Sequence, residues 1–163
     1  MRINTPKNCR KKLRQIVLYL TQKSRLRPFI WHNIYSFLYF IDFDFYEKYE
    51  CHLAGATYIK TDDLSAGFLN LVNNLVDIKT DDPHVGFLNL VDNLVDKKDE
   101  DSPESLTSQE KSVVESVFKR LSKKNPKQLL ELCQKDIPWR CAQEDEILEY
   151  ESVFYRTPEY SVK

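Results

Sequence analysis

The chain has 163 residues, of which 42% are hydrophobic, 12% aromatic and 30% charged. This length and composition predict one folded domain with its own core, and they exclude a chain that is disordered throughout. Only three glycines are present, with no GxGxxG or Walker-type pattern, and the four cysteines form no CxxC pair. Nucleotide-binding loops, zinc ribbons and thioredoxin-type sites are therefore not expected.

The longest apolar stretch, residues 29–45, is interrupted by polar side chains, and the N-terminus lacks the apolar core of a secretory signal. We therefore expect no membrane segment and a cytoplasmic location with reduced thiols. The net charge of −1 hides a gradient: residues 1–41 hold nine bases and no acid, whereas residues 42–104 hold fifteen acids and five bases. A basic end suggests nucleic acid or an acidic partner, but attraction between two halves of one fold is the simpler explanation.

The first predicted helix covers about residues 6–23. Thr5 followed by a proline is a typical helix start, and apolar residues then recur at helical spacing. The other face of this helix carries Arg10, Lys11 and Arg14, which are candidate contacts for nucleic acid.

A second helix is predicted over about residues 29–49. It is apolar almost all round, which is typical of a central, buried helix. Asp42 and Asp44 lie near its end, and carboxylates beside so many aromatic residues need partners. We expect them to cap the helix, or to pair with tyrosine hydroxyls or with bases of the first helix. Residues two apart on a helix point to different sides, which argues against a shared catalytic pocket.

A tandem duplication follows a turn and short extended segment at 53–60. Residues 60–78 and 79–97 are two nearly identical 19-residue copies, each with apolar residues at helical spacing. Asp63 or Ser65 in the first copy, and Asp82 in the second, are candidate N-caps. Either both helices pack side by side, or one is an insert. Residues 97–105 are predicted to form an exposed, acidic loop.

The last third of the chain predicts three more helices. Thr107 to Glu110 is a capping box that opens a helix to about Lys124, and Asn125 before a proline caps a short helix that ends at 136–139. A further helix is expected from Glu144, with loose or extended residues from 157. The predicted fold is mainly α: a single helical domain of six or seven helices around the central aromatic-rich helix, with at most one small strand pair near 56–60.

Three stretches together resemble a known family. They are LYFIDFDFYEKY at 38–49 followed by AGATYIK at 54–60, then LTSQE at 106–110, and finally DIPW at 136–139 with EYESVFYR at 149–156. In this order they resemble the Panacea domain, the SocA-like antitoxin family that includes phage-associated proteins, over about residues 13–160. The resemblance implies a non-enzymatic protein that binds and neutralises a cognate toxin, and in some members hands the toxin to a protease.

Candidate partner contacts are Tyr35, Tyr39, Asp42, Asp44, Tyr46 and Trp139. Tyrosine combines contact area with a hydrogen bond and is frequent at interfaces, whereas a tryptophan such as Trp139 is more often a core anchor. The first alternative function is nucleic-acid binding, for example to the protein's own promoter DNA, through Arg10, Lys11 and Arg14. A second is an enzyme with an unrecognised site. No catalytic or cofactor site is predicted. A metal site is not predicted either, because Cys51, His52, Cys133 and Cys141 lack the close-spaced ligand pair that tetrahedral sites normally show.

Overall fold

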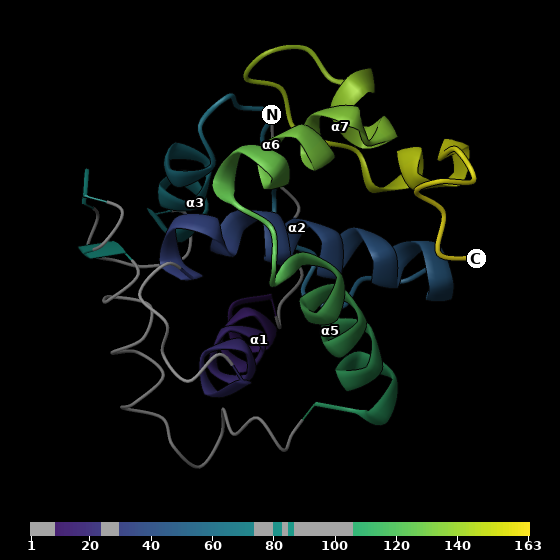
Figure 1. Cartoon of the computed structure of the whole chain (residues 1–163), viewed down its shortest axis with the longest axis horizontal. Helices are drawn as coiled ribbons and strands as arrows, with labels where there is room; N and C mark the ends of the chain where they lie inside the picture. Colours follow the sequence, from purple (N-terminus) through teal and green to yellow (C-terminus); the bar gives the residue numbers. More distant parts are fainter. Residues whose placement is uncertain (1–8, 24–29, 74–79, 83–84, 87–105) are drawn as a thin grey trace.

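The computed structural model describes residues 9–23, 30–73, 80–82, 85–86 and 106–163 (Figure 1). In these ranges six α-helices and one 3₁₀-helix follow one another: α1 (Cys9–Lys23), α2 (Ile30–Tyr49), α3 (Leu64–Asn73), α5 (Ser108–Leu121), α6 (Pro126–Lys135), α7 (Ile137–Cys141) and η2 (Tyr150–Tyr155). The predicted mainly helical fold is confirmed. Within the described ranges the one isolated β-bridge pairs Ile59 with Ile147, where the sequence predicted at most one small strand pair.

Helix α2 occupies the centre of the molecule, as its apolar circumference predicted (Figure 1). It contacts α1, α3, α5, α6 and η2, and every residue from 33 to 45 is buried. In Figure 1, α6 and α7 lie on one side of α2, and α1 and α5 lie on the other. A helix covered on all sides must be apolar on all sides, which explains why α2 has no polar face over these residues.

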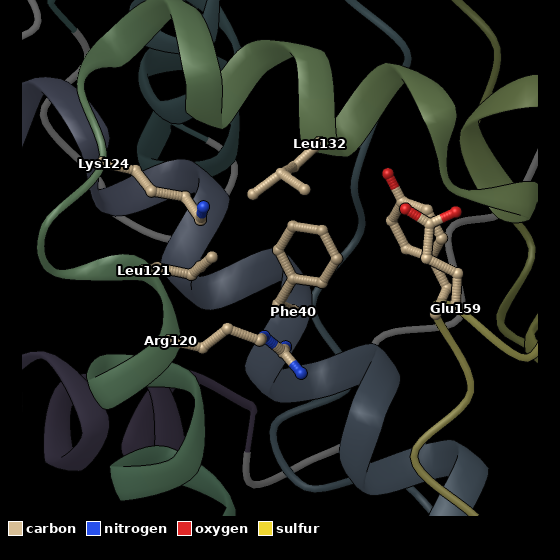
Figure 2. Close-up of a pocket in the computed structure, with 7 residues that line it drawn as sticks. Phe40, Arg120, Leu121, Lys124, Leu132 and Glu159 are labelled. Atoms are coloured by element: carbon tan, nitrogen blue, oxygen red, sulfur yellow. The ribbon is translucent and has the colours of Figure 1, made fainter.

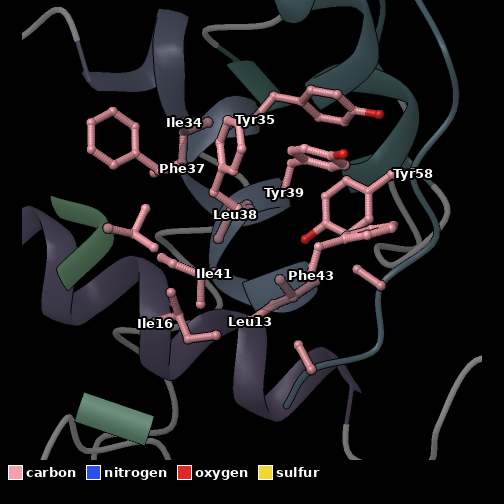
Figure 3. Close-up of a cluster of buried hydrophobic side chains, with 14 of the residues drawn as sticks. Leu13, Ile16, Ile34, Tyr35, Phe37, Leu38, Tyr39, Ile41, Phe43 and Tyr58 are labelled. Atoms are coloured by element: carbon pink, nitrogen blue, oxygen red, sulfur yellow. The ribbon is translucent and has the colours of Figure 1, made fainter. Parts of the chain in front are cut away.

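An aromatic cluster forms the core between α2 and two segments that cover it, residues 53–60 and helix α7 (Figure 3). The ring of Tyr58 lies 5.5 Å from that of Tyr35 and 5.9 Å from that of Tyr39, both with edge-on geometry. Trp139 of α7 meets Tyr39 edge-on at 5.6 Å. Edge-to-face pairs are favoured by the ring quadrupoles, and large buried rings contribute much of the apolar area that stabilises a small domain.

Helices α5 and α6 begin close to the predicted positions. Thr107 accepts the backbone N–H of Glu110 at 3.2 Å, but the Glu110 carboxylate binds Lys12 of α1 at 2.8 Å instead of closing the capping box. The box at α6 is complete, because Asn125 and Gln128 each accept the other's backbone N–H, at 2.9 and 3.0 Å. At α5, the Glu110 side chain therefore forms a long-range ion pair and does not close the predicted capping box.

The helix predicted from Glu144 is wrong. Leu148 N donates to Tyr58 O at 2.8 Å and Lys60 N donates to Glu146 O at 2.9 Å, so this stretch is extended. Only from Tyr150 does the chain turn into the 3₁₀-helix η2. The backbone groups of 146–148 are satisfied by a distant segment, and local apolar spacing cannot reveal such a partner.

The residues from 157 onward, which were expected to be loose or extended, form a turn and contacts with α2. Tyr160 N donates to Thr157 O at 3.0 Å, which closes a turn. Beyond it, Ser161 Oγ and Val162 N donate to the Glu47 carboxylate of α2 at 2.7 and 3.1 Å. The C-terminal segment is thus tied to the central helix.

The first copy of the duplication provides α3, which packs on α2. Gly67 lies against Tyr35 so closely that a Cβ atom there would meet the tyrosine ring at 3.0 Å. Most of the second copy, the predicted loop 97–105 and residues 1–8 lie outside the described residues. Within the described ranges, none of the helices combines the length and apolar character that a membrane span requires.

Candidate functional site

Arg156 lies at the centre of a buried charged cluster, although η2 itself is at the surface. Its Nε and Nη2 donate to the two carboxylate oxygens of Asp136 at 3.0 and 2.6 Å, which is a bidentate pair. Its Nη1 donates to Asp44 at 2.8 Å and to Glu47 at 3.1 Å. Burial disfavours the charged form, but the carboxylates of Asp44 and Asp136 outweigh it and raise the pKa of Arg156. Arg156 therefore stays charged in a fully buried position.

Each carboxylate around Arg156 has a further partner. Arg120 of α5 donates to Asp44 at 2.7 Å, Tyr39 donates to Asp136 at 2.8 Å, and Ser161 donates to Glu47. Helix α2, helix α5, the start of α7 and the C-terminal segment are consequently joined at one point. Every acid in this cluster is engaged in holding elements together, which indicates a structural role.

Asp42 binds the turn at 53–60 and faces away from that cluster. Its carboxylate accepts the backbone N–H groups of Ala54, Gly55 and Ala56 at 2.9–3.3 Å and the hydroxyl of Tyr58 at 2.7 Å. Burial raises the pKa of Asp42, and these donors oppose the rise. Gly55 has a φ of 70°, a left-handed conformation that suits glycine and lets the three N–H groups converge.

The predicted need of the two aspartates for partners is confirmed, with one correction. Asp42 does pair with a tyrosine hydroxyl, that of Tyr58. Asp44 pairs with Arg156 and Arg120, and not with a base of the first helix. The two side chains also point to different sides of α2, as their spacing predicted.

A surface aromatic cluster, which we define as Tyr46, His52, Tyr150 and Phe154, joins the end of α2 to η2. The Tyr46 ring lies 5.0 Å from His52, 5.4 Å from Tyr150 and 5.8 Å from Phe154. Phe154 is 45% exposed, and the adjacent Tyr155 is 80% exposed. Exposed aromatic side chains on a rigid base are typical of protein–protein contact sites.

Carboxylates and one lysine surround the surface aromatic cluster. The Tyr46 hydroxyl donates to Glu151 at 3.3 Å. Burial, followed by the charges of Glu151 and Glu50, raises the pKa of Tyr46. On the other side, Lys163 Nζ lies 5.4 Å from the centre of the Phe154 ring, a cation–π contact. A partner at this surface would thus meet aromatic area with charged groups at its edge.

A second surface feature is a pocket of about 210 Å³ between α2, α5, α6 and the C-terminal segment (Figure 2). We call it the charged pocket. Phe40, Leu121 and Leu132 provide its apolar part, and Arg120, Lys124, Glu159 and Tyr160 complete its lining. It is smaller than the roughly 300–1,000 Å³ of pockets that bind drug-sized ligands.

Five of the six candidate partner contacts lie in the interior, including Trp139, for which a core position was favoured. Tyr35, Tyr39, Asp42, Asp44 and Trp139 are each 3% exposed or less. Their side chains are used in the aromatic core and in the two carboxylate networks, so a partner cannot reach them without opening the fold. Tyr46 alone of the six is partly exposed, and it belongs to the surface aromatic cluster.

The predicted basic face of α1 is also smaller than expected. Arg14 is buried at 4% exposure, Arg10 is half-buried, and Lys11 is exposed. Beside them, Lys12 is paired with Glu110 of α5. A more exposed group of lysines, Lys119, Lys123 and Lys127, lies on α5, α6 and the turn between them. The run of bases without acids over residues 116–130 could have revealed it.

The cysteines and histidines do not form a metal site within the described residues, where no group of three or more potential ligands comes together. Cys9 and Cys133 are buried, whereas Cys51 and Cys141 are exposed. Burial raises the pKa of Cys9 to about 12, so its thiol is a poor nucleophile. Burial likewise raises the pKa of Cys133.

Comparisons with family models, with curated proteins and with solved structures find no match for this chain. The arguments that follow rest on the residues, contacts and charges described above.

Proposed function

We propose that this protein is a non-enzymatic, antitoxin-like protein that binds and neutralises a cognate toxin through the surface formed by the end of α2 and η2. The observation that carries the proposal is the surface aromatic cluster, extended by Tyr155. Its rings pack on one another while Phe154 and Tyr155 remain exposed at 45% and 80%. Rigid aromatic side chains lose little entropy on binding, which is why they dominate many protein interfaces.

The packing and ion pairs beneath this surface support the same proposal. The stacked pair Phe43 and Tyr150, with centroids 4.2 Å apart, links the surface aromatic cluster to the core of α2. Arg156, directly after η2, anchors the helix from beneath. A binding surface held in one conformation pays less to order itself when the partner arrives. The resemblance of 38–60 and 149–156 to SocA-like antitoxins includes this surface, and it extends the proposed partners to a protease that degrades the delivered toxin.

The test is co-expression of this chain with the product of the adjacent gene, followed by a pull-down and a growth assay. We expect a stable complex and restored growth. Replacing both Phe154 and Tyr155 by alanine should weaken the complex about 10- to 100-fold, as loss of interface anchors does. The matched control is Val85→Ala, because Val85 is also an exposed hydrophobic residue at 39% and lies outside this surface.

Two results would count against the proposal in different ways. If the wild-type chain is folded but neither binds the adjacent product nor restores growth, the antitoxin function is wrong. If the complex forms and the double alanine variant binds as well as the Val85 control, the function stands but the surface is wrong.

Nucleic-acid binding, including regulation of the protein's own promoter, is the second candidate, and Lys119, Lys123 and Lys127 favour it. These exposed lysines are better placed for phosphate contacts than buried Arg14. Retention on DNA should fall steeply with salt, because phosphate contacts release counterions. Replacing Lys123 and Lys127 by glutamate should abolish retention, whereas Lys11→Glu should reduce it less. Retention that is insensitive to salt would contradict this candidate.

A further inference from the structure

The charged pocket has opposite charges on its two sides. Figure 2 shows Lys124 and Arg120 on one side of the Phe40 ring and Glu159 on the other. Leu132 lies across from Phe40, so the space between the charged groups is apolar. This distribution is independent of the surface aromatic cluster, which uses other residues.

On the cationic side of the pocket, Arg120 is held in place by a buried carboxylate and by an aromatic ring. Arg120 Nη2 donates to the buried carboxylate of Asp44 at 2.7 Å, and the guanidinium carbon lies 5.5 Å from the centre of the Phe40 ring. The Arg120 side chain is nevertheless 40% exposed. Because a guanidinium has five N–H donors in a fixed plane, it can bind Asp44 and still present donors to a ligand. Lys124 adds a second, more flexible cation.

The opposite side offers an acceptor. Glu159 is exposed and lines the pocket with the adjacent Tyr160. Tyr160 follows the turn closed on Thr157, and Glu47 holds the chain just beyond it through Ser161. The position of this side relative to α2 is therefore fixed by the same carboxylate network that fixes Arg156.

We propose that the charged pocket binds a small zwitterionic molecule with a carboxylate at one end, a short apolar middle and an ammonium group at the other end. The carboxylate would contact Arg120 and Lys124, and the ammonium group would contact Glu159. With a purely anionic ligand, Glu159 would have no partner and would repel the ligand. A purely cationic ligand would be repelled by the two basic side chains. With a volume of about 210 Å³ the pocket suits a molecule smaller than a drug-sized ligand.

The experiment is an NMR titration of the full-length protein with three probes of nearly the same length: ε-aminocaproate, caproate and hexylamine. The amide and methyl signals of Leu121 and Leu132 report on occupancy, because both residues line the pocket. We expect ε-aminocaproate to bind in the millimolar range. Caproate and hexylamine should each bind about threefold to fivefold more weakly, the loss expected for one partly exposed ion pair.

Matched substitutions test which charges matter. Lys124→Gln and Glu159→Gln should each weaken ε-aminocaproate binding by about the same threefold to fivefold. The controls are Lys123→Gln and Glu131→Gln, exposed residues of the same type that do not line the pocket. A thermal unfolding curve for each variant verifies that it is folded.

The proposal is overturned if the three probes bind equally, if the control variants lose as much affinity as the pocket variants, or if the signals of Leu121 and Leu132 do not move. None of these measurements involves the toxin, so their outcome is independent of the proposed antitoxin function.

Discussion

Replacing Arg156 by methionine should strongly destabilise the protein. The guanidinium makes four hydrogen bonds of 2.6–3.1 Å to Asp44, Glu47 and Asp136, all inside the fold. Methionine is unbranched like the arginine stem and keeps much of its apolar packing, but it has no guanidinium and leaves three buried carboxylates facing one another. Removing one partner of a buried ion pair costs about 3–5 kcal/mol, a large part of the roughly 5–15 kcal/mol by which proteins are stable.

The assay is equilibrium unfolding in urea, followed by tryptophan fluorescence. Trp139 is buried against Tyr39, whose hydroxyl binds the same Asp136, so its emission reports on this region. A loss of 3–5 kcal/mol corresponds to a fall in Tm of about 6–20 °C for a chain of this size. Arg156→Lys keeps the charge but loses the bidentate geometry, and it should fall between wild type and the methionine variant.

The control is Arg140→Met on α7, where the arginine is exposed. It should change the unfolding free energy by less than about 0.5 kcal/mol. If Arg156→Met unfolds within about 1 kcal/mol of wild type, the cluster is not what fixes η2 to α2, and the structural role assigned to Arg156 is wrong.

Three further predictions concern other parts of the molecule. Burial raises the pKa of Asp42 above its ordinary 3.8, so the folded state holds this proton more tightly and stability falls as the pH rises from about 4 toward the raised pKa. Urea unfolding at several pH values should therefore show Asp42→Asn to be most destabilising in acid; a constant difference would contradict this. Gly67→Ala should destabilise by about 1–3 kcal/mol, because the new Cβ meets the Tyr35 ring at 3.0 Å. Gly86→Ala, where the nearest atom is a flexible leucine methyl at 3.3 Å, should change stability by less than about 0.5 kcal/mol, and equal melting shifts for the pair would refute the argument. Iodoacetamide should label the exposed Cys51 and Cys141 first and the buried Cys9 and Cys133 only on unfolding, as mass spectrometry can show.

The sequence by itself determined the helical class and the central position of α2. Local physics controls these features: apolar residues at helical spacing, a helix that is apolar all round, and caps such as Thr107 and Asn125 beside the helices they start. It also determined that Asp42 and Asp44 need partners, because buried carboxylates must be hydrogen-bonded. All of these features depend on residues close together in the chain or on general rules of burial.

Only the tertiary structure decided which partners these groups have. Arg156 and Asp44 are 112 positions apart, and nothing in the residues between them indicates that they meet. Tyr39 and Tyr46 are both tyrosines of one helix, yet one is fully buried and the other is partly exposed at the surface aromatic cluster. Composition cannot distinguish them, because the same side chain is stable in a core and at an interface; the elements that pack over each position make the difference.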